Sequence, residues 1–103
     1  MKVVIIGGWG TIGQAVANEL KSRHEVVIVG HSKGDYTCDI NSIDSLDKLF
    51  QQLKPFNAVV SATGKIHFED FSKMTPDKYM IGLKDKLMGQ VNIVIAGQKH
   101  IEN

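Results

Sequence analysis

A glycine-rich turn near the N-terminus is the part of the sequence best suited to chemistry. Glycines recur at every third position, Gly7, Gly10 and Gly13, between an apolar run and a helical pattern. Such a turn directs backbone N–H groups and the positive end of a helix toward a phosphate. We expect Gly7 to permit the tight turn, Gly10 to let the backbone approach a pyrophosphate, and Gly13 to allow close helix packing. This context favours a dinucleotide site over a purely structural turn.

Apolar strands and amphipathic helices alternate along the chain and would position this turn. Strands are predicted over residues 3–6, 25–29, 35–40 and 58–60, and helices over residues 11–23, 43–53 and 76–97. Strands that are apolar on both faces belong to a parallel sheet covered by helices on both sides. The pattern predicts an α/β fold with a partial, doubly wound, Rossmann-like parallel sheet in the order 3-2-1-4, forming one domain over residues 1–103.

The last helical pattern is long and contains three glycines. Its apolar face is formed by Leu83, Leu87, Met88, Val91, Val94 and Ile95. We expect Gly82, Gly89 and Gly97 to weaken this helix locally. In a sheet of four strands the last strand is an unpaired edge, and the helix beside it lacks part of its cover. We therefore expect a homo-oligomer or a poorly soluble chain.

The glycine turn and its context resemble the short-chain dehydrogenase/reductases, a family of NAD(P)-binding Rossmann proteins. The segment from Gly7 to Gly13, with Trp9, Thr11 and Ile12 between the glycines, is similar to their cofactor loop. The better-known members have a glycine where Thr11 stands, and Trp9 is large for this loop. The resemblance implies that the whole segment binds the cofactor.

Two further segments are similar to cofactor-binding positions of the family. Asp39 and Ile40 follow the third predicted strand, where family members place an aspartate that contacts the adenine. The segment Ser61-Ala62-Thr63-Gly64 follows the fourth strand, in the place of an Asn-Asn-Ala-Gly-like turn beside the cofactor ribose. The resemblance implies that both segments border the dinucleotide.

Lys86 has two interpretations. Lys86-x-x-Gly89 falls where many family members have Asn-x-x-Gly, so Lys86 would replace an asparagine that supports the proton relay. Alternatively, it is an ordinary solvated lysine on a helix. The sequence does not separate these two roles.

The end of the second strand indicates which dinucleotide is preferred. Rossmann folds that prefer NAD carry Asp or Glu there, about 20 residues past the glycine loop, to bind the ribose hydroxyl. Here the segment reads Gly30-His31-Ser32-Lys33 and has no carboxylate. His31, Ser32 and Lys33 could donate hydrogen bonds or positive charge to a 2′-phosphate. We therefore predict NADP as the cofactor, with NAD less favoured.

The second signature of the family, a serine followed by Tyr-x-x-x-Lys, is not found in the sequence. Tyr36 is followed four residues later by Ile40, and Tyr79 by Leu83. In the family this segment lies on a helix after a fifth strand, so the resemblance covers only an N-terminal, cofactor-binding portion. No residue here is expected to be catalytic, and whether the chain alone is an enzyme is left open.

Three functions are compatible with these patterns. The first is the NADP(H)-binding part of an oxidoreductase that transfers hydride to or from an unidentified carbonyl or alcohol. The second is a non-catalytic dinucleotide-binding module or sensor. The third is an inactive truncated product.

Composition and charge exclude several other classes. The chain is 43% hydrophobic and 22% charged, which is typical of a globular protein. Its 12 basic and 11 acidic residues are interleaved, so no nucleic-acid surface is expected. The four histidines have no metal-ligand spacing, and no metal is expected. The short N-terminal apolar run predicts neither a signal peptide nor a membrane span, and the lone Cys38 fits a reducing compartment, so we expect the cytoplasm.

Overall fold

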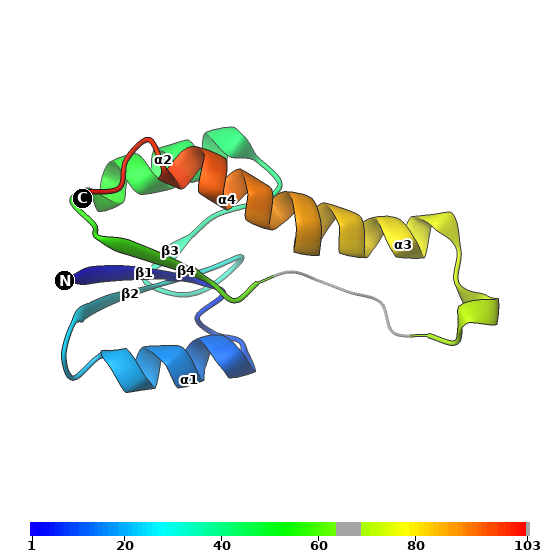
Figure 1. The fold of residues 1–103 in the computed structure, drawn as a ribbon, viewed down its shortest axis with the longest axis horizontal. Coiled ribbons are helices and arrows are strands. Elements are labelled where there is room, and N and C mark those ends of the chain that lie inside the picture. The colour runs from blue at the N-terminus through cyan, green and yellow to red at the C-terminus, as the bar shows by residue number, and fades with distance from the viewer. Residues whose placement is uncertain (64–68, 103) are drawn as a thin grey trace.

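The computed structural model describes residues 1–63 and 69–102 and contains a four-stranded parallel sheet between helical layers (Figure 1). The strands are β1 (Lys2–Ile6), β2 (Glu25–Gly30), β3 (Tyr36–Thr37) and β4 (Ala58–Ser61). The helices are α1 (Thr11–Leu20), α2 (Ile43–Leu53), α3 (Pro76–Gly82) and α4 (Gly89–Gly97), with a 3-10 turn η1 (Phe71–Lys73) and a π-helical segment η2 (Leu83–Met88). The order β3-β2-β1-β4 confirms the predicted Rossmann-like sheet.

The sheet is built around β1. Val3 lies opposite Val26 of β2 on one side and Ala58 of β4 on the other. Four successive residues of β1 are buried, because helices cover both faces of the sheet. This placement brings the carboxyl ends of β1, β2 and β4 to one edge of the sheet, where the glycine turn begins.

Each face of the sheet has its own hydrophobic core. On one face α2 and α4 cover Val4, Ile6, Val27 and Val29, as the upper layer of Figure 1 shows. Phe50 and Phe56 join this core with ring centroids 5.2 Å apart. On the other face α1 packs alone, through Ala17, on Val3 and Ile5. Three layers therefore hold the strand ends in place.

Two predicted elements are shorter than the sequence pattern indicated. The helix predicted to Arg23 ends at Leu20. The strand predicted over residues 35–40 has ladder pairing only at Tyr36 and Thr37. Beyond it the Asp39 amide donates to Ser45 Oγ instead of to a strand, at 3.0 Å. This side-chain partner turns the chain out of the sheet and toward α2.

Ser42 fixes the start of α2 at Ile43, the first residue of the predicted helix. Its hydroxyl accepts a hydrogen bond from the Ser45 amide at 3.2 Å, which satisfies one of the free donors of the first turn. The helix buries Leu46, Leu49, Phe50 and Leu53 and ends before Lys54. The 3.6-residue spacing of these side chains is what places α2 on the sheet.

The last helical pattern is divided into α3, η2 and α4, and the α-helical pattern is interrupted between Gly82, which ends α3, and Gly89, which begins α4. Gly89 and Gly97 are also buried contact points, a role that the sequence analysis did not predict. A Cβ atom on Gly89 would lie 2.6 Å from Ile40 Cδ1, and one on Gly97 would lie 3.5 Å from the Phe50 ring. These two glycines let α4 lie close to the loop after β3 and to α2, while Ile93 between them is buried in the core.

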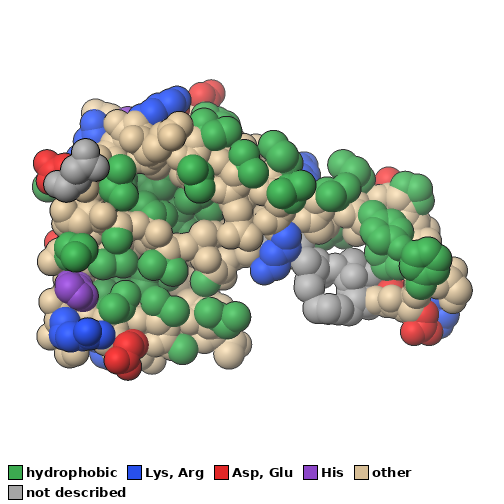
Figure 2. Space-filling view, in the orientation of Figure 1, with side chains coloured by type: hydrophobic (Ala, Val, Ile, Leu, Met, Phe, Trp, Pro, Cys, Tyr) green, Lys and Arg blue, Asp and Glu red, His purple; other side chains and the backbone are tan. Residues whose placement is uncertain are grey.

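The larger apolar residues of this region face solvent. They are Tyr79, Met80, Ile81, Leu83, Leu87, Met88, Val91, Val94 and Ile95. We call this set the outer stripe. In Figure 2 hydrophobic side chains are visible along the arm formed by α3 and the start of α4. The predicted apolar face therefore exists, but it points away from the core.

The edge formed by β4 is unpaired along most of its length in the described part of the chain, as predicted. The Glu102 amide donates to the Phe56 carbonyl just before β4, at 2.9 Å. A groove of about 310 Å³ runs between β4 and α4, lined by residues such as Val59, Ile93 and Ile101. This edge is thus open and largely apolar.

Candidate dinucleotide-binding site

A hollow of about 300 Å³ lies at the carboxyl ends of β1, β2 and β4. It is lined by Gly7, Trp9, Gly10, Gly30, His31, Ile40, Ala62, Thr63 and Asp85. Open parallel sheets bind ligands at this edge, where neighbouring connections lead to opposite faces. Here α1 lies on one face, and α2 and α4 on the other.

Gly7 and Gly13 are required by the fold of the turn itself. Gly7 has φ +88°, a left-handed conformation that L side chains rarely adopt, and a Cβ there would lie 2.5 Å from the Ala62 carbonyl. A Cβ on Gly13 would overlap the Gly7 carbonyl oxygen. Both glycines therefore have the roles predicted for them, the tight turn and the close packing of α1.

Gly10 is different, because nothing in the described chain prevents a side chain there. It has an ordinary φ of −74°, and a Cβ would meet only the Gly7 carbonyl, at 3.5 Å. Gly10 lines the hollow and immediately precedes α1, whose first turn receives no side-chain cap in the described residues and carries no acidic residue. The space over uncapped N–H groups fits a phosphate group.

Thr11 and Ile12 occupy the first turn of α1 but do not line the hollow. Both are exposed, and Ile12 is 72% exposed. Their backbone N–H groups, rather than their side chains, point to the uncapped end of the helix. This arrangement agrees with a role through the backbone, which remains a prediction.

The loop after β2 brings His31 and Lys33 to the glycine turn. His31 lines the hollow. Lys33 Nζ lies over the Trp9 ring, 4.9 Å from its centroid. Ser32 is exposed and is not among the lining residues. Two of the three residues predicted for the 2′-phosphate are thus on or beside the hollow.

Of the two residues predicted near the adenine, the structure brings only Ile40 to the hollow. Its carbonyl accepts from Asn92 Nδ2 at 3.0 Å, which ties this loop to α4. Asp39 is exposed, and one of its carboxylate oxygens accepts from the Asn41 amide at 2.9 Å. Asp39 therefore borders the site without lining it.

The residues at the end of β4 and directly after it line two different surfaces. Ala62 and Thr63 line the hollow, whereas Ser61 lines the groove between β4 and α4. The Ser61 hydroxyl is buried and has no hydrogen-bond partner among the described residues. Gly64 lies outside the described residues. Lys86 Nζ donates to the Thr63 carbonyl at 3.1 Å, so Lys86 contacts this segment without lining the hollow.

Residues 3–100 match the model of the NAD dependent epimerase/dehydratase family. The chain belongs to this family. The match spans every element that forms the hollow, from β1 to α4. It confirms the predicted membership among short-chain dehydrogenase/reductase-like, NAD(P)-binding Rossmann proteins. No curated protein matches the chain.

Several solved structures of similar fold match nearly the whole length of this member of the epimerase/dehydratase family. The protein lin1944 from Listeria innocua is 39% identical, with a TM-score of 0.93 over 99% of this chain and 51% of its own. A small-chain dehydrogenase in complex with NADPH is 19% identical, with a TM-score of 0.87 over 100% and 47%. A short-chain dehydrogenase/reductase from Vibrio parahaemolyticus is 18% identical, with a TM-score of 0.81 over 94% and 51%. The chain spans about half the length of these proteins, and the two more distant ones support the fold alone.

Membership in this NAD-dependent family supports a nicotinamide dinucleotide as the ligand. The open position at Gly10 fits its pyrophosphate, and the uncapped end of α1 would stabilise the phosphate charge. The predicted class of cofactor is therefore supported by both the family and the geometry.

Two residues of the hollow were not among those predicted. Asp85 comes from η2, and Asn41 Nδ2 donates to its carboxylate at 2.9 Å. Only tertiary packing brings it to the hollow, and no local pattern of the sequence signals this. Gly30 could have been recognised, because it ends an apolar strand, and a Cβ there would overlap the Lys33 carbonyl oxygen.

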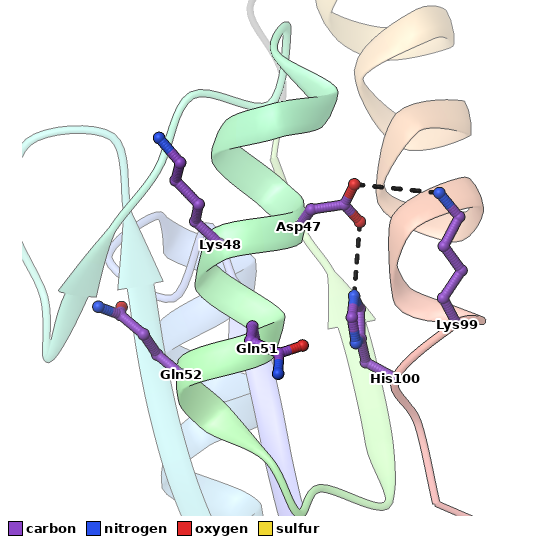
Figure 3. Close-up of a pocket in the computed structure, with 6 residues that line it drawn as sticks. All are labelled: Asp47, Lys48, Gln51, Gln52, Lys99 and His100. Atoms are coloured by element: carbon purple, nitrogen blue, oxygen red, sulfur yellow. Dashed lines mark ion pairs between the residues drawn. The ribbon is translucent and has the colours of Figure 1, made fainter.

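A larger hollow, of about 600 Å³, lies elsewhere, across α2 and the C-terminal end of α4 (Figure 3). Asp47 of α2 forms ion pairs there with Lys99 Nζ at 3.9 Å and His100 Nε2 at 3.5 Å. These contacts join two helices and lie away from the glycine turn. Within residues 1–63 and 69–102, no group of three or more potential metal ligands is found, and no helix is long and apolar enough to cross a membrane.

Proposed function

We propose that this chain is the NADP(H)-binding part of an oxidoreductase of the short-chain dehydrogenase/reductase type. The bound dinucleotide would supply or accept the hydride exchanged with a carbonyl or alcohol substrate. The observation that carries the proposal is the open position at Gly10, at the uncapped end of α1 and in a chain of an NAD-dependent family. The residues of this chain bind and orient the cofactor.

The cofactor would lie along the carboxyl ends of the strands. The α1 N-terminus and Gly10 hold the pyrophosphate, Ile40 borders the adenine, and the Ala62–Thr63 segment borders the ribose next to the nicotinamide. Lys86 holds that segment through the Thr63 carbonyl. This contact favours a positioning role for Lys86 over that of a freely solvated lysine.

NADP is favoured over NAD because the segment Gly30-His31-Ser32-Lys33, at the end of β2, contains a lysine and no acidic residue. His31 lines the hollow and Lys33 lies beside it, so both could reach a 2′-phosphate. The small-chain dehydrogenase of similar fold is described in complex with NADPH, which is compatible with this preference.

Calorimetric titration of the chain with NADPH and with NADH tests the proposal. We expect NADPH to bind about tenfold more tightly, the difference of roughly 1.4 kcal/mol that one charge-assisted contact gives. His31→Asp places a carboxylate at the end of β2 and should shift the ratio toward NADH, whereas His31→Gln, the matched control, should shift it less. Equal affinities in the wild-type chain, or a ratio unmoved by His31→Asp, would contradict the NADP assignment.

A non-catalytic dinucleotide-binding module is the second candidate. Within these 103 residues neither Tyr36 nor Tyr79 is followed by lysine at the fourth position, so the chain tested alone is compatible with cofactor binding without catalysis. NADPH binding without NADPH oxidation, across a panel of aldehydes and ketones, would support this candidate for the isolated chain. Binding of neither cofactor would instead favour an inactive truncated product.

The proposal extends to the state of the chain. We place it in the cytoplasm, because its cysteine, Cys38, is a free buried thiol, as in a reducing compartment. We also propose that residues 1–103 form one domain, built on the four-stranded sheet. We further propose that the chain self-associates through the outer stripe, whose exposed apolar side chains run along α3, η2 and α4.

A further inference from the structure

Trp9 and Lys33 form a contact between the two loops that border the phosphate end of the hollow. Lys33 Nζ lies 4.9 Å from the centroid of the Trp9 ring. Trp9 belongs to the glycine turn after β1, and Lys33 to the loop after β2. Trp9 is itself 46% exposed and lines the hollow. The Lys33 ammonium group thus contacts a side chain that lines the hollow.

Two glycines of the β2 loop let the loop lie close against the indole. A Cβ on Gly30 would lie 3.4 Å from Trp9 Cδ1, and one on Gly34, which has φ +131°, would lie 3.1 Å from Trp9 Nε1. The loop therefore packs against one edge of the ring. Gln14 Nε2 donates to the backbone carbonyl of Trp9 at 2.6 Å, which ties the turn that carries the ring to α1.

The contact with the indole restricts the lysine. An exposed lysine side chain loses rotamer entropy when it is immobilised on a ligand. A cation over an indole ring is attracted by the negative face of the ring, and this attraction favours the rotamers that place Lys33 Nζ there. Part of the ordering of Lys33 is therefore complete before an anion arrives.

We propose that Trp9 is a positioning residue that holds the Lys33 ammonium at the 2′-phosphate of NADP. The inference rests on the proposed function, because it assumes that a dinucleotide occupies the hollow. It adds that discrimination between NADP and NAD depends on an aromatic ring in the glycine turn, acting through Lys33.

Calorimetry with NADPH and NADH on four variants tests this role. Lys33→Ala should weaken NADPH binding about tenfold through the lost charge-assisted contact, and Trp9→Leu roughly two- to fivefold through the lost cation–π contact. NADH affinity should change little in either variant. Trp9→Phe, the conservative variant, should keep most of the preference. In the Lys33→Ala background, Trp9→Leu should have no further effect on the NADPH to NADH ratio.

Fluorescence supplies a second readout, because Trp9 is the only tryptophan. Lys33→Ala should change the emission of Trp9 in the free protein. Titration with adenosine 2′,5′-bisphosphate, which carries the 2′-phosphate without nicotinamide, should change the emission of the wild-type chain more than that of Lys33→Ala. Thermal melting of each variant identifies any loss of folding, and Trp9→Phe keeps the test usable if Trp9→Leu unfolds.

The outcomes separate this inference from the proposed function. If the wild-type chain binds neither dinucleotide, or shows no preference for NADPH, the proposed function fails and this inference fails with it. If the wild type prefers NADPH and Trp9→Leu retains the full preference, only the role of Trp9 is wrong. Equal losses for both cofactors in Trp9→Leu would mean that the ring serves the shape of the turn or stacks on the adenine, and would also overturn the inference.

Discussion

The glycines of the turn serve different physical purposes. At position 13 the protein itself excludes a side chain, since a Cβ there overlaps the Gly7 carbonyl oxygen. Gly10 has open space around it, so the fold does not require a glycine there, and we propose that the ligand does. The spacing of the glycines predicted the motif, whereas only the surroundings of each Cα separate the two roles.

These roles can be separated by alanine substitutions at the two positions. Gly13→Ala should lower the free energy of unfolding by about 1–3 kcal/mol, because the added methyl group forces the turn and α1 apart. Gly10→Ala should leave it nearly unchanged and weaken NADPH binding. Urea denaturation and calorimetry of both variants provide the comparison. A Gly10→Ala protein that binds NADPH like the wild type would show that the cofactor does not approach this backbone.

The Cys38 thiol is predicted to be inert at neutral pH. It is 8% exposed, and burial, with the neighbouring Asp39 charge, raises its pKa from 9.0 to about 11. At pH 8 iodoacetamide should therefore alkylate the native chain much more slowly than the urea-unfolded chain. Similar rates in the two states would show that Cys38 is accessible.

The same raised pKa has a consequence for stability at high pH. The folded chain keeps the proton that the unfolded chain releases near pH 9, so the contribution of this thiol is fully present below pH 9 and is lost as the pH rises toward 11. Between pH 8 and pH 10.5 the wild-type chain should lose more free energy of unfolding than Cys38→Ala. An equal loss in the two proteins would contradict the raised pKa.

At the scale of elements, α2 and α4 are joined by small residues, a shared core and the charged cluster around Asp47. The two ion pairs of Asp47 are partly exposed, and such pairs contribute little individually. We expect Asp47→Ala to lower the free energy of unfolding by about 0.5–1 kcal/mol. Lys48→Ala, at a neighbouring exposed position of the same helix with no ion pair in the described structure, is the control. Equal effects of the two changes would show that the cluster contributes nothing specific.

The sequence predicted the elements better than it predicted their contacts. Hydrophobic spacing was sufficient to predict α2 over residues 43–53, because this signal is local. The early end of β3 was not predictable, since the partner of the Asp39 amide lies on another element. For the same reason Asp85 was missed, because packing of η2 beside the strand ends brings it to the hollow. On α4, the close contacts of Gly89 with Ile40 and of Gly97 with Phe50 were not predicted, because both partners lie on other elements.

At the scale of the whole molecule, the outer stripe is an apolar surface that the described part of the chain leaves uncovered. Leu87 of η2 and Val94 of α4 are both exposed, and both line one groove on this surface. If the stripe mediates self-association, Leu87→Lys and Val94→Lys should shift the sedimentation profile toward monomer. Lys84→Glu, an exposed charge change on η2, is the control and should have less effect. A wild-type chain that sediments as a monomer at high concentration would contradict the proposed oligomer.

The central position of β1 also sets an order of assembly. β1 precedes both of its neighbours in the chain, β2 at a separation of 23 residues and β4 at 55, as the pairs Val3↔Val26 and Val3↔Ala58 show. Closing the longer loop costs about 0.8 kcal/mol more chain entropy. Pairing of β1 with β2 should therefore come first in folding, and β4 should join a nucleus that already exists. Since β4 is also an edge strand, its separation from β1 should be an early step of sub-global opening, beside Thr63 and the hollow that it lines.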